Sequence, residues 1–460
     1  MQSTEPVAVP FDASLGMAEA AAALYPDSRT DSFSWEGPRW WWAGALDVEA
    51  LVLDSYQFLS SMLGPNAAFT SSDAVATFNS LAHLRIDGRT PQSFAPLSGF
   101  RRTNDGWVRL HANYPHHERA LMRGLRLRDA RGLDATLSSL SAQEAETTIT
   151  QAGGIAAAVR RREEFLATPA GGVLAAEPLV NLQWHDTPGP RRASPVGSDP
   201  TSLPLAGLRI VDLTRVIAGP CAGRILASLG ADVLRIDPPD FPELLDAHID
   251  TSFGKRSVVA DLSASDVAQQ LHAALDQADA VLLGYRTGSL DRFGLASDEL
   301  LERHPHLAVL ELNAWGHSGP RRSIRGFDSI VQAATGISVA YGTGDDPAAP
   351  DFTPGALPVQ ALDHATGVVV AATAIGILRH RVDGRSARAR FSLARTAHEL
   401  LSLPTPPASA TQRQSAVELR DTDSAFGALR YVPPALRWGG RRLNYLTPPP
   451  PVGSSALTWR

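Results

Sequence analysis

Short apolar segments alternate with amphipathic segments across the middle of the chain. The apolar runs, each typical of a buried strand, are residues 208–213, 231–237, 257–262, 280–285 and 307–314. The segments between them that repeat apolar residues every three or four positions are 219–230, 263–278 and 297–305. Strands that alternate with helices predict parallel βαβ units, so we expect an α/β fold with a doubly wound, Rossmann-like parallel sheet. Ser263 or Ser265 is the expected N-cap of the second helix.

Two further patterns follow this region. Residues 387–393 alternate apolar and polar side chains, which predicts a strand with one buried face. The longest apolar run, residues 368–378, is shorter than the roughly 20 residues that a membrane-spanning helix needs. It therefore predicts a buried helix, which begins near Asp363, and no membrane partner.

The N-terminal part has a less regular pattern that predicts a small α+β domain. A helix is expected over residues 47–63 with Asp47 as its N-cap, and a hairpin over residues 100–112 that turns at Asp105 and Gly106. Further helices are expected at 116–125, 141–152 and 161–167. Two Pro-rich segments, 186–204 and 403–415, divide the chain. The predicted division is a small domain (1–185), a linker (186–204), the α/β domain (205–400), and a Pro-rich linker with a closing tail (401–460).

The composition excludes several function classes. The chain has 460 residues, is 44% hydrophobic and 20% charged, and carries a net charge of −6, which argues against nucleic acid as a main partner. A single cysteine excludes an internal disulfide framework and fits a reducing compartment. The first residues have no basic stretch of the kind that begins a signal peptide, so we expect a cytoplasmic protein.

Several candidate sites have an ordinary structural explanation. The turn at 218–220 opens a helix and lacks a G-x-G-x-x-G motif, so its free N–H groups could bind an anion or carbonyl oxygen, or the turn could merely pack. Cys221, in the same turn, has no obvious partner and is expected to be a buried structural residue. His111, His116 and His117 lack the further ligands of a metal site, so none is predicted. The Gly-rich stretch 341–347 is expected to be a surface loop.

Asp363 allows two interpretations from the residues alone. Aspartate is a favoured N-cap because its oxygen accepts the first free N–H groups of a helix. A carboxylate fixed at a helix start beside an apolar segment is also partly desolvated, which suits a nucleophile. The residues alone favour the N-cap.

Seven motifs in fixed order change that balance. They are GLRIVDLTRVIAGP, GADVLRIDPP, GKRSVVADL, YRTGSLDRFGL, WGHSGP, GFDSIVQA and ALDHATG followed by ARARFSLARTA. Together, over about residues 205–398, they resemble the class III (CaiB/BaiF) CoA-transferases, which include formyl-CoA transferase, carnitine CoA-transferase and α-methylacyl-CoA racemase. The resemblance implies a CoA-binding domain and an enzyme that moves CoA from an acyl-CoA to a free carboxylic acid. It implies no permanently bound cofactor, since the CoA thioester is a substrate, and it implies a homodimer.

The resemblance also assigns roles to single residues. Asp363 matches the catalytic aspartate, which would carry CoA as an aspartyl thioester. Lys255, the chain's only lysine, and Arg256 are expected in a cationic wall that meets the CoA phosphates; the alternative for Lys255 is an ordinary surface residue. The other matched positions, expected near the thioester, the adenine, the phosphates or the pantetheine arm, are Ile217, Ala218, Ala260, Tyr285, Arg286, Arg292, Arg325, Gly326, Phe327 and Asp328.

Two departures from the family pattern matter. Racemase members place a histidine where this chain has Phe327, which cannot donate a proton, so transferase is favoured over racemase. His364 is adjacent to Asp363, but neighbours on a helix point in different directions. A CoA-binding protein without catalysis, with Asp363 only a cap, is the third possibility. Segments resembling the family's small C-terminal domain precede the α/β domain here, which predicts a circular permutation or a remnant of a tandem fusion.

Overall fold

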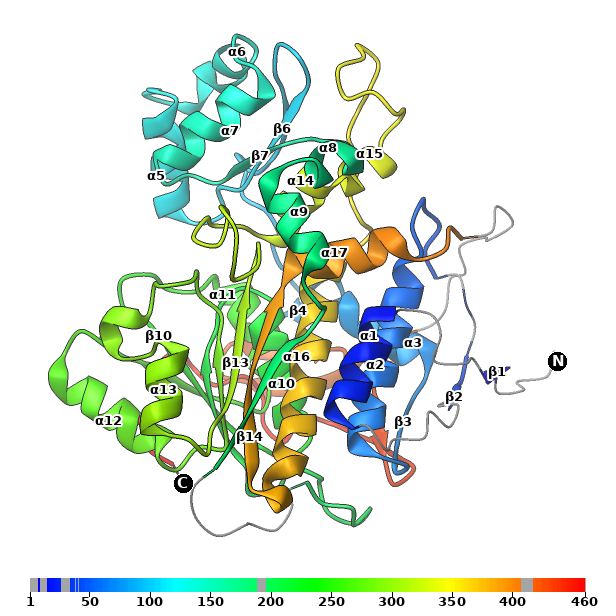
Figure 1. The fold of residues 1–460 in the computed structure, drawn as a ribbon, viewed down its shortest axis with the longest axis vertical. Helices are drawn as coiled ribbons and strands as arrows, with labels where there is room; N and C mark the ends of the chain where they lie inside the picture. Colours follow the sequence, from blue (N-terminus) through cyan, green and yellow to red (C-terminus); the bar gives the residue numbers. More distant parts are fainter. Residues whose placement is uncertain are drawn as a thin grey trace.

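A seven-stranded sheet forms the centre of the lower part of the molecule (Figure 1). The strand order is β11-β10-β9-β12-β13-β14-β8, and only the edge strand β8 runs antiparallel to its neighbour. The bounds are β8 Asn181–Asp186, β9 Arg209–Leu213, β10 Asp232–Asp237, β11 Arg256–Val259, β12 Ala280–Leu283, β13 Ala308–Asn313 and β14 Arg385–Ser392. The predicted parallel sheet is confirmed for six strands. This computed structural model describes residues 7–8, 15–25, 34–37, 39, 41–187, 196–406 and 417–459, so parts of both Pro-rich segments and of the N-terminus lie outside the described residues.

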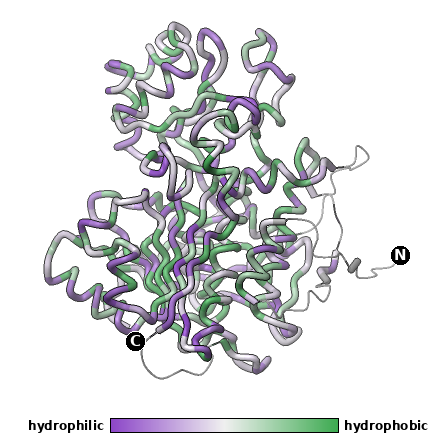
Figure 2. Tube along the Cα trace, viewed as in Figure 1, coloured by the Kyte–Doolittle hydropathy of each residue, from purple (hydrophilic) through white to green (hydrophobic). Residues whose placement is uncertain are grey.

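Helices cover both faces of the sheet, as a doubly wound arrangement requires. Successive residues of β9 enter different apolar cores: Ile210 packs with the helices α10 and α16, and Val211 packs with α12 and α13. Figure 2 shows the apolar residues gathered along the strands. The helices on the two faces are α10 Ala218–Ser228, α16 Ala361–Arg379, α12 Ser265–Leu275 and α13 Ser297–Arg303.

The central helix α16 is apolar and buried, as predicted. The segment Ala361–Asp383 is long and apolar enough to cross a membrane, but its most apolar window is 100% buried inside the protein, which is the environment of a core helix. α16 packs on α10 and on α2 (Val48–Leu63). The N-cap of α2 is Asp47, whose side chain accepts a hydrogen bond from the backbone N–H of Ala50, as predicted.

Three local predictions differ from the structure. The N-cap of α12 is Ala264, not Ser263 or Ser265, because the Ser263 hydroxyl bonds to Asp261 instead. The N-cap of α16 is Gln360, so Asp363 lies inside the first turn. Strand β14 is buried on both faces, because α13 lies over its polar side, where Arg388 binds Ser297 and Asp298.

Residues 1–185 do not form the single small domain that the sequence suggests. A three-stranded sheet, the hairpin β5–β6 with β7, forms an upper unit with α5 and α7 (Figure 1). By contrast, α2 packs on α16 and β8 completes the large sheet, so the ends of this segment belong to the lower part. The upper unit comprises β5 Gly99–Arg102, β6 Trp107–Leu110, α5 Pro115–Gly124, α6 Leu133–Leu137, α7 Ala142–Gln151 and β7 Ala156–Ala158.

Two strands that precede the α/β domain pair with two strands that follow it. Strand β16 pairs with β4, and β17 pairs with β3, both antiparallel. Residues near the N-terminus therefore share sheets with residues that follow the second Pro-rich segment. The bounds are β3 Ala67–Phe69, β4 Arg85–Ile86, β15 Arg420–Ser424, β16 Gly427–Tyr431, β17 Leu436–Trp438 and β18 Arg441–Arg442. The remaining helices near the upper unit are α8 Arg162–Leu166, α9 Pro169–Ala176, α14 Asp328–Thr335, α15 Ile337–Ala340 and α17 Leu393–Ser402.

Candidate active site

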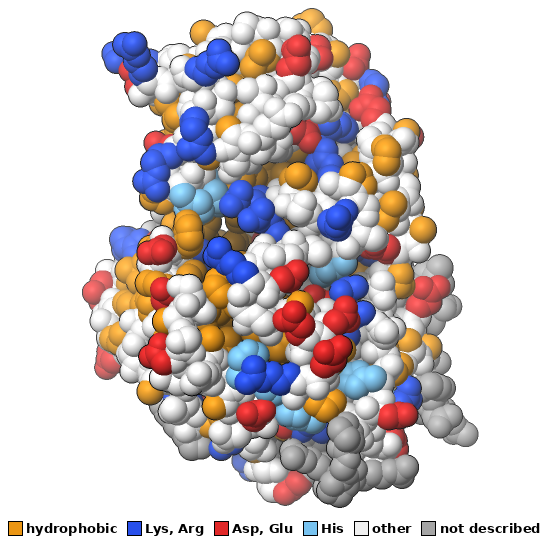
Figure 3. Space-filling model, turned by 60° about the vertical axis from the view of Figure 1, so that its left-hand side comes forward, with side chains coloured by type: hydrophobic (Ala, Val, Ile, Leu, Met, Phe, Trp, Pro, Cys, Tyr) orange, Lys and Arg blue, Asp and Glu red, His pale blue; other side chains and the backbone are white. Residues whose placement is uncertain are grey.

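A cleft of about 630 Å³ lies at the carboxyl ends of the parallel strands, between the sheet and the upper unit. Its walls come from residues after β9, β10, β11, β12 and β13, and from Tyr114, His116 and His117 of the upper unit. Figure 3 shows the hollow between the two parts, with Arg and His side chains around it. Between β9 and β12 the strand order reverses direction, and ligands of open α/β sheets bind at such a point.

Most of the predicted site residues line this cleft. Asp363 and Phe327 lie in its wall, together with Ala218 of the turn that opens α10. The others that line it are Ala260, Tyr285, Arg286, Arg292, Arg325 and Gly326. The cleft is not lined by Ile217, Lys255, Arg256 or Asp328.

Asp363 is the buried acid of the cleft. It stands in the first turn of α16 with 5% of its surface exposed. Burial raises its pKa well above the ordinary value, and the negative charge of Asp328 raises the pKa further. A carboxyl group of high pKa, when ionised, is a stronger nucleophile than an exposed one, because little water solvates its charge.

Asp328 supports Asp363 from a second helix. It is the first residue of α14, and its carboxylate accepts a hydrogen bond from the backbone N–H of Asp363 (Oδ2···N 3.0 Å) and one from Gln332. It is 1% exposed, and burial raises its pKa to about 6. Asp328 therefore does not lie along the cleft as expected but holds the backbone that carries Asp363.

The turn before α10 faces the same end of the cleft. Val216 and Ala218 line it, and α10 crosses α16 so closely that a side chain at Gly367 would lie 2.5 Å from the Ala218 carbonyl oxygen. Only glycine fits at Gly367, and this close crossing sets Asp363 near the turn. Ile217 is the N-cap of α10 and half-buried, and it turns away from the cleft.

Cys221 and His364 face away from the cleft. The Cys221 thiol is buried, burial raises its pKa to about 11, and its sulfur lies 3.4 Å from His364 Nδ1. Burial lowers the pKa of His364 to about 3, and its ring stacks on Phe78. Both expectations are confirmed: the cysteine is a buried structural residue, and the side chain of His364 does not point where that of Asp363 points.

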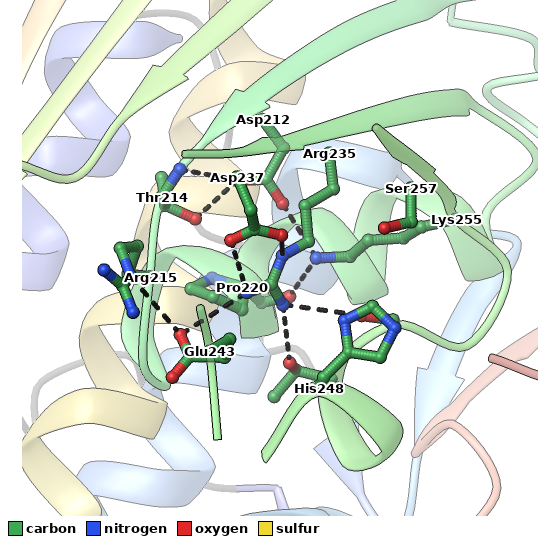
Figure 4. Close-up of polar contacts among 12 residues, drawn as sticks. Asp212, Thr214, Arg215, Pro220, Arg235, Asp237, Glu243, His248, Lys255 and Ser257 are labelled. Atoms are coloured by element: carbon green, nitrogen blue, oxygen red, sulfur yellow. Dashed lines mark hydrogen bonds and ion pairs between the residues drawn. The ribbon is translucent and has the colours of Figure 1, made fainter. Parts of the chain in front are cut away.

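The expected cationic wall at Lys255 and Arg256 is wrong. The Lys255 ammonium is fully buried beneath the first turn of α10, 2.8 Å from Asp212 and 2.8 Å from the Pro220 carbonyl oxygen (Figure 4). It is therefore neither a phosphate ligand nor a surface residue. Arg256 is also occupied, because its guanidinium donates to the carbonyl oxygen of Thr458 in the C-terminal tail.

Other cations remain in the cleft. Arg286, Arg292, Arg325 and Arg215 all line it. Burial and then the neighbouring charge of Arg286 lower the pKa of Arg325, so these two guanidinium groups lie close enough to repel each other. One guanidinium group can donate two parallel hydrogen bonds to the oxygens of a phosphate, so these arginines could hold a phosphate-bearing ligand.

Residues of the upper unit were missed by the sequence prediction. The rings of His111 and His117 contact Phe327, with 3.7 Å between the ring centroids of His111 and Phe327. Burial lowers the pKa of His111 to about 3 and that of His117 to about 2. Among the described residues no cluster of His, Cys, Asp or Glu could hold a metal ion. Tyr114 and Arg215 were also missed, because nothing in the local sequence shows that these segments meet.

Comparison with known proteins agrees with this geometry. The family model "CoA-transferase family III" matches residues 205–431. The chain is 34% identical to the "Probable fatty acyl-CoA transferase Rv3272" of Mycobacterium tuberculosis, over 39% of this chain and 47% of the relative. It is 32% identical to an acyl-CoA transferase of Gibberella moniliformis (57% and 46%) and 31% identical to the succinate–glutarate CoA-transferase of Agrobacterium fabrum (36% and 44%). The chain spans less than half the length of each of these relatives.

Solved structures give similar matches. A crystal structure of Rv3272 matches with a TM-score of 0.40 and 33% identity, over 44% of this chain and 58% of that one. A CaiB/BaiF family protein from Brucella suis matches with a TM-score of 0.38 and 27% identity, over 44% and 56%. Residues 205–431, which include the α/β domain and Asp363, match CoA-transferase family III, and the relatives above are 31–34% identical to the chain over the matched parts.

Proposed function

We propose that the protein transfers CoA between an acyl-CoA thioester and a free carboxylic acid through a covalent aspartyl-CoA thioester on Asp363. The observation that carries the proposal is the position of Asp363: a buried carboxyl group that lines the same cleft as the arginines and the Ala218 turn. The arginines supply positive charge for the CoA phosphates, and the Asp363 carboxyl group would lie beside the thioester carbonyl of the bound acyl-CoA.

The reaction divides into two balanced exchanges. A carboxylate oxygen of Asp363 attacks the thioester carbonyl, the C–S bond breaks, and a mixed anhydride and CoA thiolate result. The thiolate then attacks the Asp363 carbonyl, and the donor acid leaves as a carboxylate. The acceptor carboxylate repeats both steps in reverse and leaves as its CoA thioester, which restores Asp363.

The surrounding residues suit this chemistry. Carboxylates are weak nucleophiles in water, so the burial of Asp363 favours attack once the proton has left. The first N–H groups of α10, at Ala218 and Gly219, have no partner within the helix and could stabilise the oxyanion of each tetrahedral intermediate. Pro220, the third residue, has no N–H to offer.

An epimerase is the less favoured alternative. It would need a second acid or base near Asp363, and Phe327 stands where racemases have histidine. The two histidines that contact the Phe327 ring, His111 and His117, have pKa values lowered by burial to about 3 and about 2, so neither is in the protonated imidazolium form near neutral pH. These two pKa values support transfer over epimerisation.

A trapping experiment tests the proposal. Incubation with acyl-CoA and hydroxylamine should convert Asp363 to its hydroxamate, read by mass spectrometry of the peptide that contains it. Omission of acyl-CoA, and the Asp363→Ala variant, should give no label. Acyl-CoA binding without label would support a non-catalytic CoA-binding protein. Deuterium uptake at the α-carbon without transfer would support an epimerase.

The acyl substrates need a screen. The relatives are named for fatty acyl, succinate and glutarate transfer, so the donors should include long-chain and dicarboxylic acyl-CoA thioesters, each paired with free acids. The homodimer expected from the resemblance stays a prediction. The pairing of β3 and β4 with β17 and β16 supports the inference of a circular permutation, since it joins segments from before and after the α/β domain in shared sheets.

A further inference from the structure

Val216, in the turn between β9 and α10, has a strained backbone. Its φ angle is +70°, a left-handed conformation that β-branched residues rarely adopt. Val216 and Ala218 both line the cleft at the end where Asp363 lies. Such strain persists only when neighbouring groups hold the backbone in place, and it concentrates at functional sites. The group that holds this turn therefore bears on catalysis.

That group is Glu243, on the segment between β10 and α11 (Leu245–Thr251). Its Oε2 accepts a hydrogen bond from the backbone N–H of Val216 at 2.8 Å. The side chain is 2% exposed, and Figure 4 shows it directed at the turn, beside Arg215. Burial raises the pKa of Glu243, but Arg235, Arg215 and the hydrogen bonds outweigh it, so the net pKa lies below the ordinary value and the group is ionised.

Glu243 also binds the upper unit. Its Oε1 accepts a hydrogen bond from the Tyr114 hydroxyl, which comes from the loop between β6 and α5. The Arg215 guanidinium lies over the Tyr114 ring, 5.4 Å from its centroid, and so closes the same contact. One carboxylate therefore connects the strained turn on the sheet side of the cleft with the unit on the other side.

If Glu243 only balanced the charge of nearby arginines, its hydrogen bonds to the turn and to the upper unit would be left without an explanation. Arg235 lies 3.4 Å from Glu243, but it already has a bidentate partner in Asp237, with contacts of 2.7 and 3.0 Å. Arg235 therefore does not need Glu243 to be neutralised. Glu243 also forms an ion pair with Arg215 at 3.7 Å, but charge balance for Arg215 does not account for the hydrogen bonds that Glu243 accepts from the Val216 N–H and the Tyr114 hydroxyl.

We propose that Glu243 is a positioning residue, which holds the Val216–Ala218 turn against the reacting thioester and, through Tyr114, fixes the upper unit over the cleft. The proposal rests on the proposed function, since the turn would face the thioester only in a CoA-transferase. Glu243 itself touches no reacting atom.

Four proteins test this: wild type, Glu243→Gln, Tyr114→Phe and the double variant, with the exposed Glu302→Gln as the matched control. An amide cannot accept from Val216, Leu244 and Tyr114 at once, so Glu243→Gln should lower kcat roughly 10- to 100-fold. The KM for acyl-CoA should change less than about threefold, because Arg286, Arg292 and Arg325 stay in the cleft wall although Arg215 loses its ion pair with Glu243. Tyr114→Phe should lower kcat less than Glu243→Gln does. The kcat of the double variant should be no lower than that of Glu243→Gln, since both substitutions remove the same hydrogen bond between Tyr114 and Glu243.

Hydrogen–deuterium exchange gives a second readout that needs no activity. The peptide covering residues 213–221 should exchange faster in Glu243→Gln than in wild type or the control. An unchanged kcat with unchanged exchange overturns the proposal, as does a loss of kcat that only follows a fall in the melting temperature. If the wild type transfers no CoA from any donor, the proposed function fails, and the exchange comparison still decides whether Glu243 holds the turn.

Discussion

The carboxylate of Asp328 accepts a hydrogen bond from the backbone N–H of Asp363, with 3.0 Å between Oδ2 and N. Gln360, at the N-cap position of α16, makes no such side-chain bond, so Asp328 supplies from α14 the acceptor that a local cap would provide. The same contact brings two buried carboxyl groups together. Asp328 thus fixes the backbone of Asp363 and, by its charge, raises the pKa of the Asp363 carboxyl group.

Asp328→Asn should move the acid limb of the pH–rate profile to lower pH. Asp363 attacks only when ionised, so activity is lost as pH falls through its raised pKa. Removing the neighbouring negative charge lowers that pKa, while the amide oxygen still accepts from the backbone. We expect the acid limb of kcat/KM for acyl-CoA to move toward lower pH, while the plateau at higher pH changes little. The exposed Asp345→Asn should leave the profile unchanged, and a shift of the Asp328→Asn limb to higher pH would contradict this account.

Lys255→Met should destabilise the fold rather than weaken CoA binding. It leaves Asp212 buried and unpaired, since both side chains are fully inaccessible to solvent. Breaking a buried pair in this way costs about 3–5 kcal/mol, measurable by urea denaturation. The double variant Lys255→Met, Asp212→Leu should recover much of this loss, because no charge is left unpaired. A raised KM for acyl-CoA at unchanged stability would instead restore the phosphate-binding role.

The strands were predictable because their signal is local. Strand β12, for example, is a run of four buried apolar residues between a turn and a polar loop, and length and flanks suffice to identify it. The cap of α16 was not predictable, because Asp328 reaches it from 35 residues away in the sequence. Local propensity favoured Asp363 as the cap, whereas the tertiary contact frees that side chain for the cleft.

Site residues could be predicted where a sequence motif fixes their position in the fold. The prediction failed where the role of a residue depends on the direction of its side chain. Lys255 directly precedes strand β11, as its motif predicts, but its side chain lies beneath α10 and binds Asp212. Direction follows from the register of β11 and the path of α10, which the residues near Lys255 do not specify. Glu243 and Tyr114 had no local signal, because they meet across 129 positions in the sequence.

Arg292→Gln should raise the KM for acyl-CoA with little effect on kcat. Arg292 lines the cleft from the short helix Asp291–Phe293, and its guanidinium lies over the Phe293 ring, 4.5 Å from the ring centroid. Losing a charge-assisted phosphate contact costs about 1.5–3 kcal/mol, which corresponds to roughly a 10- to 100-fold rise in KM. The rise in KM with added salt should also be less steep than in wild type. The exposed Arg303→Gln is the control, and equal KM values for both variants would remove Arg292 from the CoA site.

Asp54→Asn should stabilise the protein at alkaline pH and not at acidic pH. Asp54 lies on α2, and its buried Oδ2 has no hydrogen-bond partner in the described structure. Burial raises its pKa from 3.8 to about 7, although Arg39 lowers it. The folded protein therefore holds this proton more tightly than the unfolded chain. The stability that the protonated group contributes is complete below pH 3.8 and is lost as pH rises through about 7.

Asparagine cannot ionise, so the Asp54→Asn variant escapes this loss, which is at most about 4 kcal/mol for a shift of this size. Melting temperatures of wild type and variant should therefore separate progressively from about pH 4 to about pH 7 and stay apart above it, while those of the exposed Asp423→Asn follow the wild type. A variant that melts below the wild type at every pH would show that the Asp54 carboxylate makes a stabilising contact instead.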